Sequence, residues 1–309
     1  MIVQNQLALI KREFWEHRSI YIVPLSIATI MILAAITGQV GISAWGSTVE
    51  IALMGAHELD MDPEVHRALI TGAVSGLGGV FLVAMWILIV FYCLDALYTE
   101  RKDKSILFWR SLPVTDAETV ISKLLVAIVI IPLITFAVIA STQLVTLIFT
   151  SIWLKFEGGN PGLLIWQALD LVDIWGGTLI VVLAVPLWLS PFVGWYLFVS
   201  AWTRRAPLAV AFLPVFILPM IERIVFKTQV LYELFFERTF AIIQLIELFG
   251  DGIENFVDNE TPLNPADLSL IGAIDLGGFL VNPGLWGGVV VCALFTGGAV
   301  WMRRYRAEG

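Results

Sequence analysis

The stretch from Glu100 to Pro113 places charged residues directly before apolar and aromatic ones, a pattern typical of a helix that binds a protein or a lipid surface. The charged part consists of Glu100, Arg101, Lys102, Asp103 and Lys104. Ile106, Leu107, Phe108 and Trp109 follow, and Pro113 interrupts the helix pattern. The apolar face of such a helix must be removed from water, either by lipid or by a groove on a partner protein. Periodicity alone leaves both alternatives open.

Asp95 is the one ionisable residue that we place within a long apolar run, near 77–97. An acid at membrane depth is a functional candidate, with a role in transport or in proton movement as one alternative. Because Asp95 lies about one turn from the end of its run, we favour a structural pair with Arg101 or Lys102. The lack of charges deeper in the apolar runs argues against an ion-coupled transporter.

The sequence contains none of the common enzyme signatures. It has no G-x-x-x-x-G-K-[ST] loop, no H-E-x-x-H and no G-x-S-x-G, so we expect no ATPase site of its own, no bound cofactor and no catalytic residue. His57 and His66 flank Glu58, Asp60, Asp62 and Glu64, but their spacing fits neither a zinc site nor an EF-hand. We therefore predict a solvated acidic loop without a metal.

The composition is that of a membrane protein. Of the 309 residues 59% are hydrophobic and 14% are charged, with a mean hydropathy of +0.88, which excludes an ordinary water-soluble domain. Cys93 and Cys292 both lie in apolar runs, where we expect them to pack rather than to form a disulfide.

Six apolar stretches approach the roughly 20 residues that a membrane span needs. We predict spans near 20–40, 77–97, 124–149, 178–202, 206–221 and 284–301. Kinks or a broken helix are expected in the fourth, with Pro186 and Pro191, and in the fifth, with Pro207, Pro214 and Pro219. The predicted fold class is thus an all-α membrane protein with six transmembrane helices.

The cationic residues predict that both termini are cytoplasmic, because Lys and Arg are retained on that side. In this orientation, five of the 18 Lys and Arg residues lie on the outer side, and the others are cytoplasmic. The five are Arg67, Lys155, Arg223, Lys227 and Arg238. Acidic residues gather in the outer segments, which explains the net charge of -8. We expect contact with membrane lipid and no nucleic-acid partner.

Two further segments are predicted to be helical outside the spans. Residues 1–19 carry Leu7, Ile10 and Phe14 at helical spacing, which indicates an interfacial amphipathic helix; the alternative is a cytoplasmic extension of the first span. Residues 222–283 mix apolar and acidic positions, which favours an extracytoplasmic helical insert. Thr115 and Glu118 form a T-x-x-E capping box that should start the helix of the third span. Spans one to five then occupy 20–221, and the sixth span with its cytoplasmic tail occupies 284–309.

One run of this sequence resembles a known family. Residues 94–114, LDALYTERKDKSILFWRSLPV, look like the segment after the second span in bacterial type-2 ABC transporter permeases, and 11–16, KREFWE, are similar to that family's interfacial helix. The span count and the insert before the last span agree with this layout.

The resemblance implies a dimer, with an identical or related second copy, that binds two cytoplasmic ATPase subunits, which use ATP and Mg. Near 105–113 it implies a coupling helix that docks on each ATPase. The implied ATPase-coupling residues are Glu100, Arg101, Asp103, Ser105, Ile106, Leu107, Phe108, Trp109, Arg110, Leu112 and Pro113, braced by Lys11, Arg12, Phe14 and Trp15.

The leading hypothesis is therefore a permease subunit of an ABC exporter in the bacterial plasma membrane, moving a hydrophobic or amphipathic substrate. A rival hypothesis is a membrane scaffold or assembly factor that binds a partner through its extracytoplasmic helices. An intramembrane enzyme is disfavoured, because no predicted span contains a nucleophile and base or a pair of metal ligands.

Overall fold

The computed structural model describes residues 2–36, 63–105, 114–156, 158–239 and 269–306, and every element in these ranges is helical. The longer helices are α1 (Ile2–Glu16), α2 (Ser19–Ile36), α4 (Pro63–Ala96), α7 (Asp116–Leu125), α8 (Ile131–Phe156), α9 (Leu171–Trp188), α10 (Ser190–Trp202), α11 (Pro207–Val225) and α16 (Pro283–Arg306). The shorter ones are α5 (Tyr98–Lys102), α12 (Val230–Tyr232), α14 (Leu270–Ala273), α15 (Leu276–Val281) and the π-helical turns η1 (Val126–Ile130), η2 (Gly162–Trp166) and η3 (Glu233–Glu237).

Six helical segments in the described ranges are long and apolar enough to cross a membrane. They are Ser19–Ile36, Ile70–Lys102, Asp116–Phe156, Leu171–Trp188, Pro207–Val225 and Pro283–Tyr305. Each overlaps one predicted span, so the predicted all-helical class with six helices of membrane-spanning length and apolarity is confirmed in the described ranges. This is a helical architecture like that of a multi-pass membrane protein. The second and third segments, of 33 and 41 residues, exceed the roughly 20 residues that cross a bilayer, so these helices extend beyond it.

The predicted break in the fourth span is present. α9 ends at Trp188, Leu189 leaves the helical conformation, and α10 begins at Ser190 with Pro191 in its first turn. Proline lacks the N–H that would continue the ladder, and the ring of Pro191 would clash in a continuous helix with the carbonyl of the residue four positions earlier, Leu187. The fifth span differs, because α11 continues as one helix through Pro214 and Pro219.

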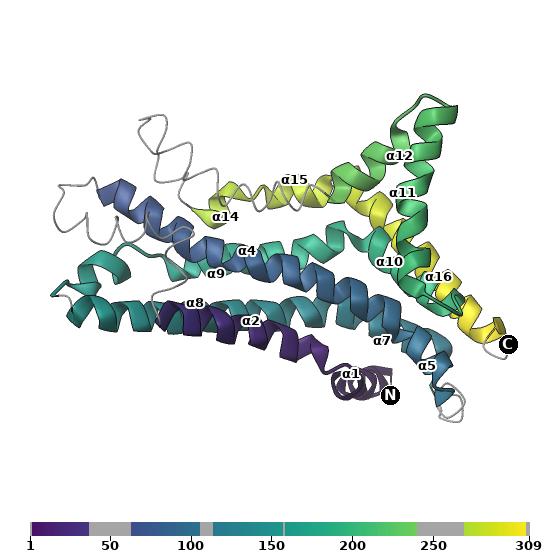
Figure 1. Cartoon of the computed structure of the whole chain (residues 1–309), viewed down its shortest axis with the longest axis horizontal. Coiled ribbons are helices and arrows are strands. Elements are labelled where there is room, and N and C mark those ends of the chain that lie inside the picture. Colours follow the sequence, from purple (N-terminus) through teal and green to yellow (C-terminus); the bar gives the residue numbers. More distant parts are fainter. Residues whose placement is uncertain (1, 37–62, 106–113, 157, 240–268, 307–309) are drawn as a thin grey trace.

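Both chain termini lie at the same end of the helix bundle, here named the terminal end (Figure 1). α5 and the start of α7 lie at this end as well, whereas α2, α4, α8 and α9 run side by side along the long axis (Figure 1). An even number of spans requires this placement of the termini. The side of the membrane that the terminal end faces stays a prediction.

The main core lies where α2, α4, α8, α9 and α10 meet, around fully buried Phe81, Met85, Ile89 and Ile131. α10 packs closely against α16. At their contact, a Cβ built on Gly194 would lie 2.8 Å from the Cα and 2.9 Å from the carbonyl oxygen of Cys292. Only a glycine allows the two backbones to approach so closely.

Replacing Gly194 by alanine is therefore expected to destabilise the protein by about 1–3 kcal/mol, the usual cost of overpacking. The contacting atoms belong to the backbone of α16 and cannot rotate away. The measurement is thermal unfolding of the purified protein in detergent. Gly297→Ala is the matched control, because a Cβ at Gly297 meets nothing within 4 Å; equal melting temperatures for the two variants would contradict the prediction.

Two acids on long helices cap short helices by accepting backbone N–H groups. Asp173 on α9 accepts from Leu270 N at 2.6 Å and from Ser269 Oγ at 2.6 Å, which holds α14 against α9. Glu222 on α11 accepts from Val230 N at 3.0 Å and Leu231 N at 2.7 Å, at the start of α12. These caps satisfy N–H groups that a helix start leaves without partners.

Several predictions fall partly or wholly outside the described residues. The coupling segment is described only as far as Ser105, so its residues 106–113 lie outside, as do His57, Glu58, Asp60 and Asp62 of the acidic loop. Within the insert 222–283 the structure describes η3 and short helices, and 240–268 lie outside. α1 is described and separates from α2 at His17 and Arg18, which disfavours a straight extension of the first span.

Candidate functional site: a buried ionic cluster at the terminal end

Glu13 enters the bundle from α1 because it shares the inward face of that helix with Leu9, one turn earlier, and both are buried. Its carboxylate accepts a hydrogen bond from Tyr92 Oη at 2.8 Å and another from Lys123 Nζ at 2.8 Å. Glu13 is 1% exposed and Lys123 is 0% exposed. A charge this deeply buried is stable only when it is paired and hydrogen-bonded, and here α1 is tied to α4 and α7 at once.

Lys123 projects from α7, whose start is fixed as the sequence predicted. Thr115 Oγ1 accepts from Glu118 N at 3.1 Å, and Thr115 N donates to Glu118 Oε2 at 2.8 Å, which completes the capping box. From this helix the Lys123 ammonium also lies 3.1 Å from Glu100 Oε1. One buried cation therefore pairs with acids from α1 and from α5.

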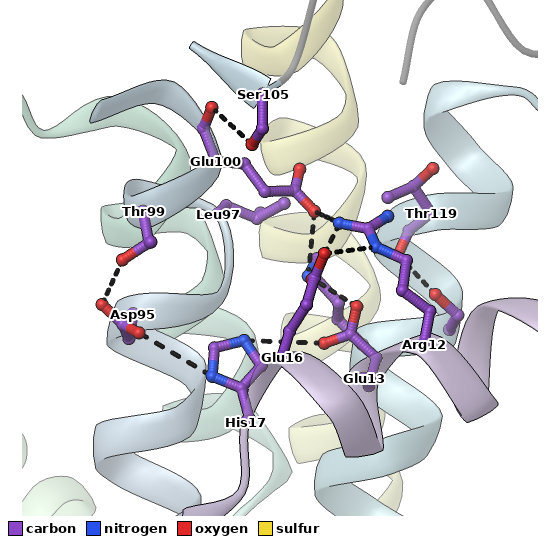
Figure 2. A network of polar contacts seen from close by, with 12 residues as sticks. Arg12, Glu13, Glu16, His17, Asp95, Leu97, Thr99, Glu100, Ser105 and Thr119 are labelled. Atoms are coloured by element: carbon purple, nitrogen blue, oxygen red, sulfur yellow. Dashed lines mark hydrogen bonds and ion pairs between the residues drawn. The ribbon is translucent and has the colours of Figure 1, made fainter. Parts of the chain in front are cut away.

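Glu100 is the centre of the cluster, since three cations from three different helices surround it. Its side chain pairs with Lys123, with Arg12 Nη2 at 2.6 Å and with Arg303 Nη1. Figure 2 shows Glu100 and Arg12 turned toward one another, with Glu13 and Glu16 next to them. Burial disfavours the charged form of Arg12, but Glu16 and Glu100 more than offset this and raise the pKa of Arg12.

Arg303, near the end of α16, joins the two sides of the predicted coupling segment. Its Nη1 donates to Glu100, which precedes the segment, and its Nε donates to Asp116 Oδ1 at 2.9 Å, which follows it. Arg303 is 4% exposed. Both flanks of 105–113 are therefore bonded to the last membrane-length helix.

Arg101 reaches in another direction and attaches α5 to α10. Its Nη2 donates to Ser200 O and, at 2.7 Å, to Thr203 O, which are carbonyls at the end of α10. Ser200 Oγ in turn accepts from Leu97 N at 3.0 Å and from Tyr98 N at 2.9 Å, where α4 passes into α5. The five residues of α5 thus connect to α1, α7, α10 and α16 together.

The expected pairing of Asp95 with Arg101 or Lys102 is wrong. Asp95 Oδ2 lies 3.8 Å from His17 Nδ1, and Asp95 Oδ1 accepts from Thr99 Oγ1 (Figure 2). The physical reason is that Arg101 lies nearer the carbonyls that end α10 and is used there. Asp95 is half exposed, which agrees with a peripheral position.

His17 is expected to make the fold sensitive to acid. Burial lowers the pKa of His17, the Lys123 ammonium lowers it further, and Glu13 and Asp95 offset only part of this effect. The unfolded chain then takes up a proton at a higher pH than the folded protein. This contribution to stability is complete above about pH 6.5 and is lost as the pH falls through the lower folded value.

Thermal unfolding between about pH 5 and pH 8 measures the effect. The wild-type melting temperature should fall more steeply toward acid than that of His17→Gln. Burial lowers the pKa of His66 as well. His66 is present in both proteins, so it affects both melting curves and does not account for a difference between them. Parallel curves for the two proteins would contradict the assignment to His17.

The structure brings only some of the residues from the sequence prediction into the cluster. Glu100 and Arg12 lie within it, and Ser105 Oγ donates to Glu100 O at 3.3 Å. Phe14 packs partly buried against the main core, whereas Lys11 and Trp15 lie on the exposed face of α1, with the Lys11 ammonium 5.4 Å from the Trp15 ring. Asp103 is exposed at the end of α5, and Ile106, Leu107, Phe108, Trp109, Arg110, Leu112 and Pro113 lie outside the described residues.

Sequence reasoning missed Glu13, Tyr92, Asp116, Lys123 and Arg303. A signal was present for two of them. Glu13 lies on the same helical stripe as Leu9, and Lys123 lies three residues after Val120 and four before Ala127, both fully buried. A charged residue on an apolar helical stripe predicts a buried partner.

A metal does not fit this cluster. Oxygen and nitrogen atoms of Glu13, Glu16 and His17 lie within 4.8 Å of one another. However, Lys123 and Tyr92 already bond to Glu13, and Arg12 holds Glu16 at 2.8 Å. The two carboxylates thus already accept hydrogen bonds from Lys123, Tyr92 and Arg12.

The chain matches none of the protein families, curated proteins or solved structures with which it was compared.

Proposed function

We propose that this chain is the transmembrane permease subunit of an ATP-driven ABC exporter, with the terminal end in the cytoplasm of a bacterial cell. In this proposal two copies, identical or closely related, form the pathway through the plasma membrane. Separate ATPase subunits bind ATP and Mg and dock on the segment near 105–113. The chain itself has no catalytic role.

The observation that supports this proposal best is the double attachment of Arg303. A segment that receives force from a motor must transmit it to the spans rather than bend at its ends. Glu100 before the segment and Asp116 after it both bond to Arg303 on α16, and Arg101 fixes the same flank to α10. Because the bonds involve buried charges, they resist displacement.

The cargo that fits the proposal is hydrophobic or amphipathic. The spans offer aliphatic and aromatic surface, and the buried charges of the cluster lie at the terminal end, where they are paired with one another. A small ion would need charged or polar groups along its path.

The test is the double variant Phe108→Asp/Trp109→Asp in the full chain. We expect it to insert in the membrane but to lose the co-purifying ATPase, identified by mass spectrometry as a protein with a phosphate-binding loop, and to lose export. The reason is that two carboxylates cannot be buried in an apolar groove without a partner. Photo-crosslinking from position 109 gives the second readout.

Phe156→Asp is the matched control, because Phe156 is 86% exposed at the end of α8, away from the cluster. It should retain both the ATPase and export. Wild-type export by the double variant, or crosslinks from position 109 to phospholipid alone, would refute the proposal. Binding of a partner through the insert 222–283, without any ATPase, would favour the scaffold hypothesis.

A further inference from the structure

A cavity of about 460 Å³ lies between α10, α11, η3 and α16, well away from the ionic cluster. Its walls are apolar and aromatic and include Phe192, Trp195, Val215 and Phe295. Its volume is within the range of about 300–1,000 Å³ that is usual for small-molecule sites. Arg238, just after η3, is the charged residue among those that line it.

The Arg238 guanidinium is held in place from two sides. Its Nε donates to Trp188 O at 2.7 Å, its Nη2 donates to Gly284 O at 2.9 Å, and its carbon lies 4.6 Å from the centre of the Trp188 ring. Trp188 O belongs to the last turn of α9, where the break before α10 leaves carbonyls without intrahelical partners. The broken span thus recruits a cation from the insert.

The contact at Gly288 explains how the guanidinium fits. A Cβ on Gly288 would lie 2.1 Å from Arg238 Nη2 and 3.1 Å from Pro191 Cγ. The missing side chain on α16 is therefore what allows the cation to reach the cavity wall. A Cβ on the neighbouring Gly287, which also lines the cavity, would meet nothing within 4 Å.

Arg238 still has donors to offer after these contacts. A guanidinium has five N–H groups, and the two hydrogen bonds above use one each at Nε and Nη2. Among the side chains that the structure describes, no acidic group forms an ion pair with Arg238. A cation beside apolar walls favours an anionic group on whatever fills the cavity.

The position along the bundle fits a ligand from the membrane. Arg238 bonds to Gly284 O in the first turn of α16, whereas Arg303 of the ionic cluster lies in the last turn of the same helix. Arg238 therefore lies at the end of α16 that is remote from the terminal end. Leu218, Leu234 and Val291 line the cavity and are 45%, 55% and 38% exposed, so it opens sideways toward lipid.

We propose that this cavity binds an amphiphile with one anionic headgroup, which enters from the surrounding bilayer, with its headgroup at Arg238 and its chain between α10, α11 and α16. The site requires only that the chain spans a membrane, and it does not depend on the export proposal. Charge complementarity selects the anionic headgroup, and the apolar walls select the chain.

The test uses the purified full chain in phosphatidylcholine vesicles and two photoreactive probes. One is hexadecyl phosphate with a diazirine in its chain, and the other is hexadecanol with the same diazirine. We expect the phosphate to label peptides of α10, α11 and α16 about tenfold more than the alcohol, because a charge-assisted contact is available only to the phosphate. Arg238→Gln should abolish this preference, and Arg238→Lys should retain most of it.

Because Arg238 also satisfies Trp188 O, its variants can fail to fold, and a glycine pair provides an independent test. Gly288→Ala displaces the guanidinium and should reduce the preference for the phosphate, whereas Gly287→Ala should leave it unchanged. Equal labelling of the wild-type protein by both probes would overturn the proposal. Crosslinks to a second copy of the chain in place of probe adducts would overturn it as well, since the second copy would then cover the cavity.

Discussion

Replacing Lys123 by methionine is expected to lower the free energy of unfolding by about 3–5 kcal/mol, the cost of removing one partner from a buried ion pair. Lys123 is fully buried and contacts Glu13 Oε1 at 2.8 Å and Glu100 Oε1 at 3.1 Å. Methionine preserves most of the side-chain volume but removes the charge. Glu13 then retains Tyr92 but loses its closest cation. Thermal unfolding in detergent and the amount of protein inserted in the membrane measure the loss.

The control and a second variant separate the charge from the packing. Lys102→Met changes an exposed cation on α5 and should alter stability by no more than about 0.5 kcal/mol. The double variant Lys123→Met/Glu13→Gln should recover part of the loss, because it removes the unpaired acid together with its partner. A double variant whose loss equals the sum of the two single losses would show that the pair does not act as a unit.

Replacing Arg303 by methionine is expected to separate ATP hydrolysis from export under the proposed function. Glu100 keeps Lys123 and Arg12 as partners, so the protein should still fold. Both flanks of 105–113, however, lose their bonds to α16. Coupling between sites is usually worth about 1–3 kcal/mol, so export per ATP hydrolysed should fall about 5–150-fold while the ATPase still co-purifies.

The neighbouring cation Arg304 supplies the matched control. Its side chain is exposed, and its guanidinium carbon lies 5.6 Å from the centre of the Tyr305 ring. Arg304→Met should keep the wild-type ratio of export to hydrolysis. If Arg303→Met keeps this ratio as well, the ionic cluster stabilises the terminal end but transmits nothing.

The two sets of predictions distinguish a structural cluster from a coupling device. Loss of stability in Lys123→Met follows from burial alone and holds whatever the protein transports. Loss of export in Arg303→Met requires, in addition, that a motor acts on the segment near 105–113. If Lys123→Met loses stability but Arg303→Met keeps wild-type export, the ionic cluster stabilises the fold and does not transmit force.

The sequence by itself determined the class of fold, because the cost of placing polar groups in hydrocarbon acts locally along the chain. Runs of apolar residues therefore mark all six spans. The pattern of Thr115 and Glu118 likewise marked the start of α7, since a capping box needs only residues within one turn. Pro186 and Pro191 marked the break at Leu189 for the same local reason.

Only the tertiary structure decided which charges meet. Glu100 pairs with residues 88 and 203 positions away, and Glu13 with Lys123 110 positions away. Spacing along the chain favoured Arg101 or Lys102 as the partner of Asp95, yet Asp95 contacts His17 and Arg101 contacts the end of α10. Arg238 falls in the predicted insert 222–283, and only the structure shows that the broken span provides the carbonyl that positions it. The reason is that a buried charge takes the partner that the packing of helices brings nearest, and that choice is not encoded by spacing along the chain.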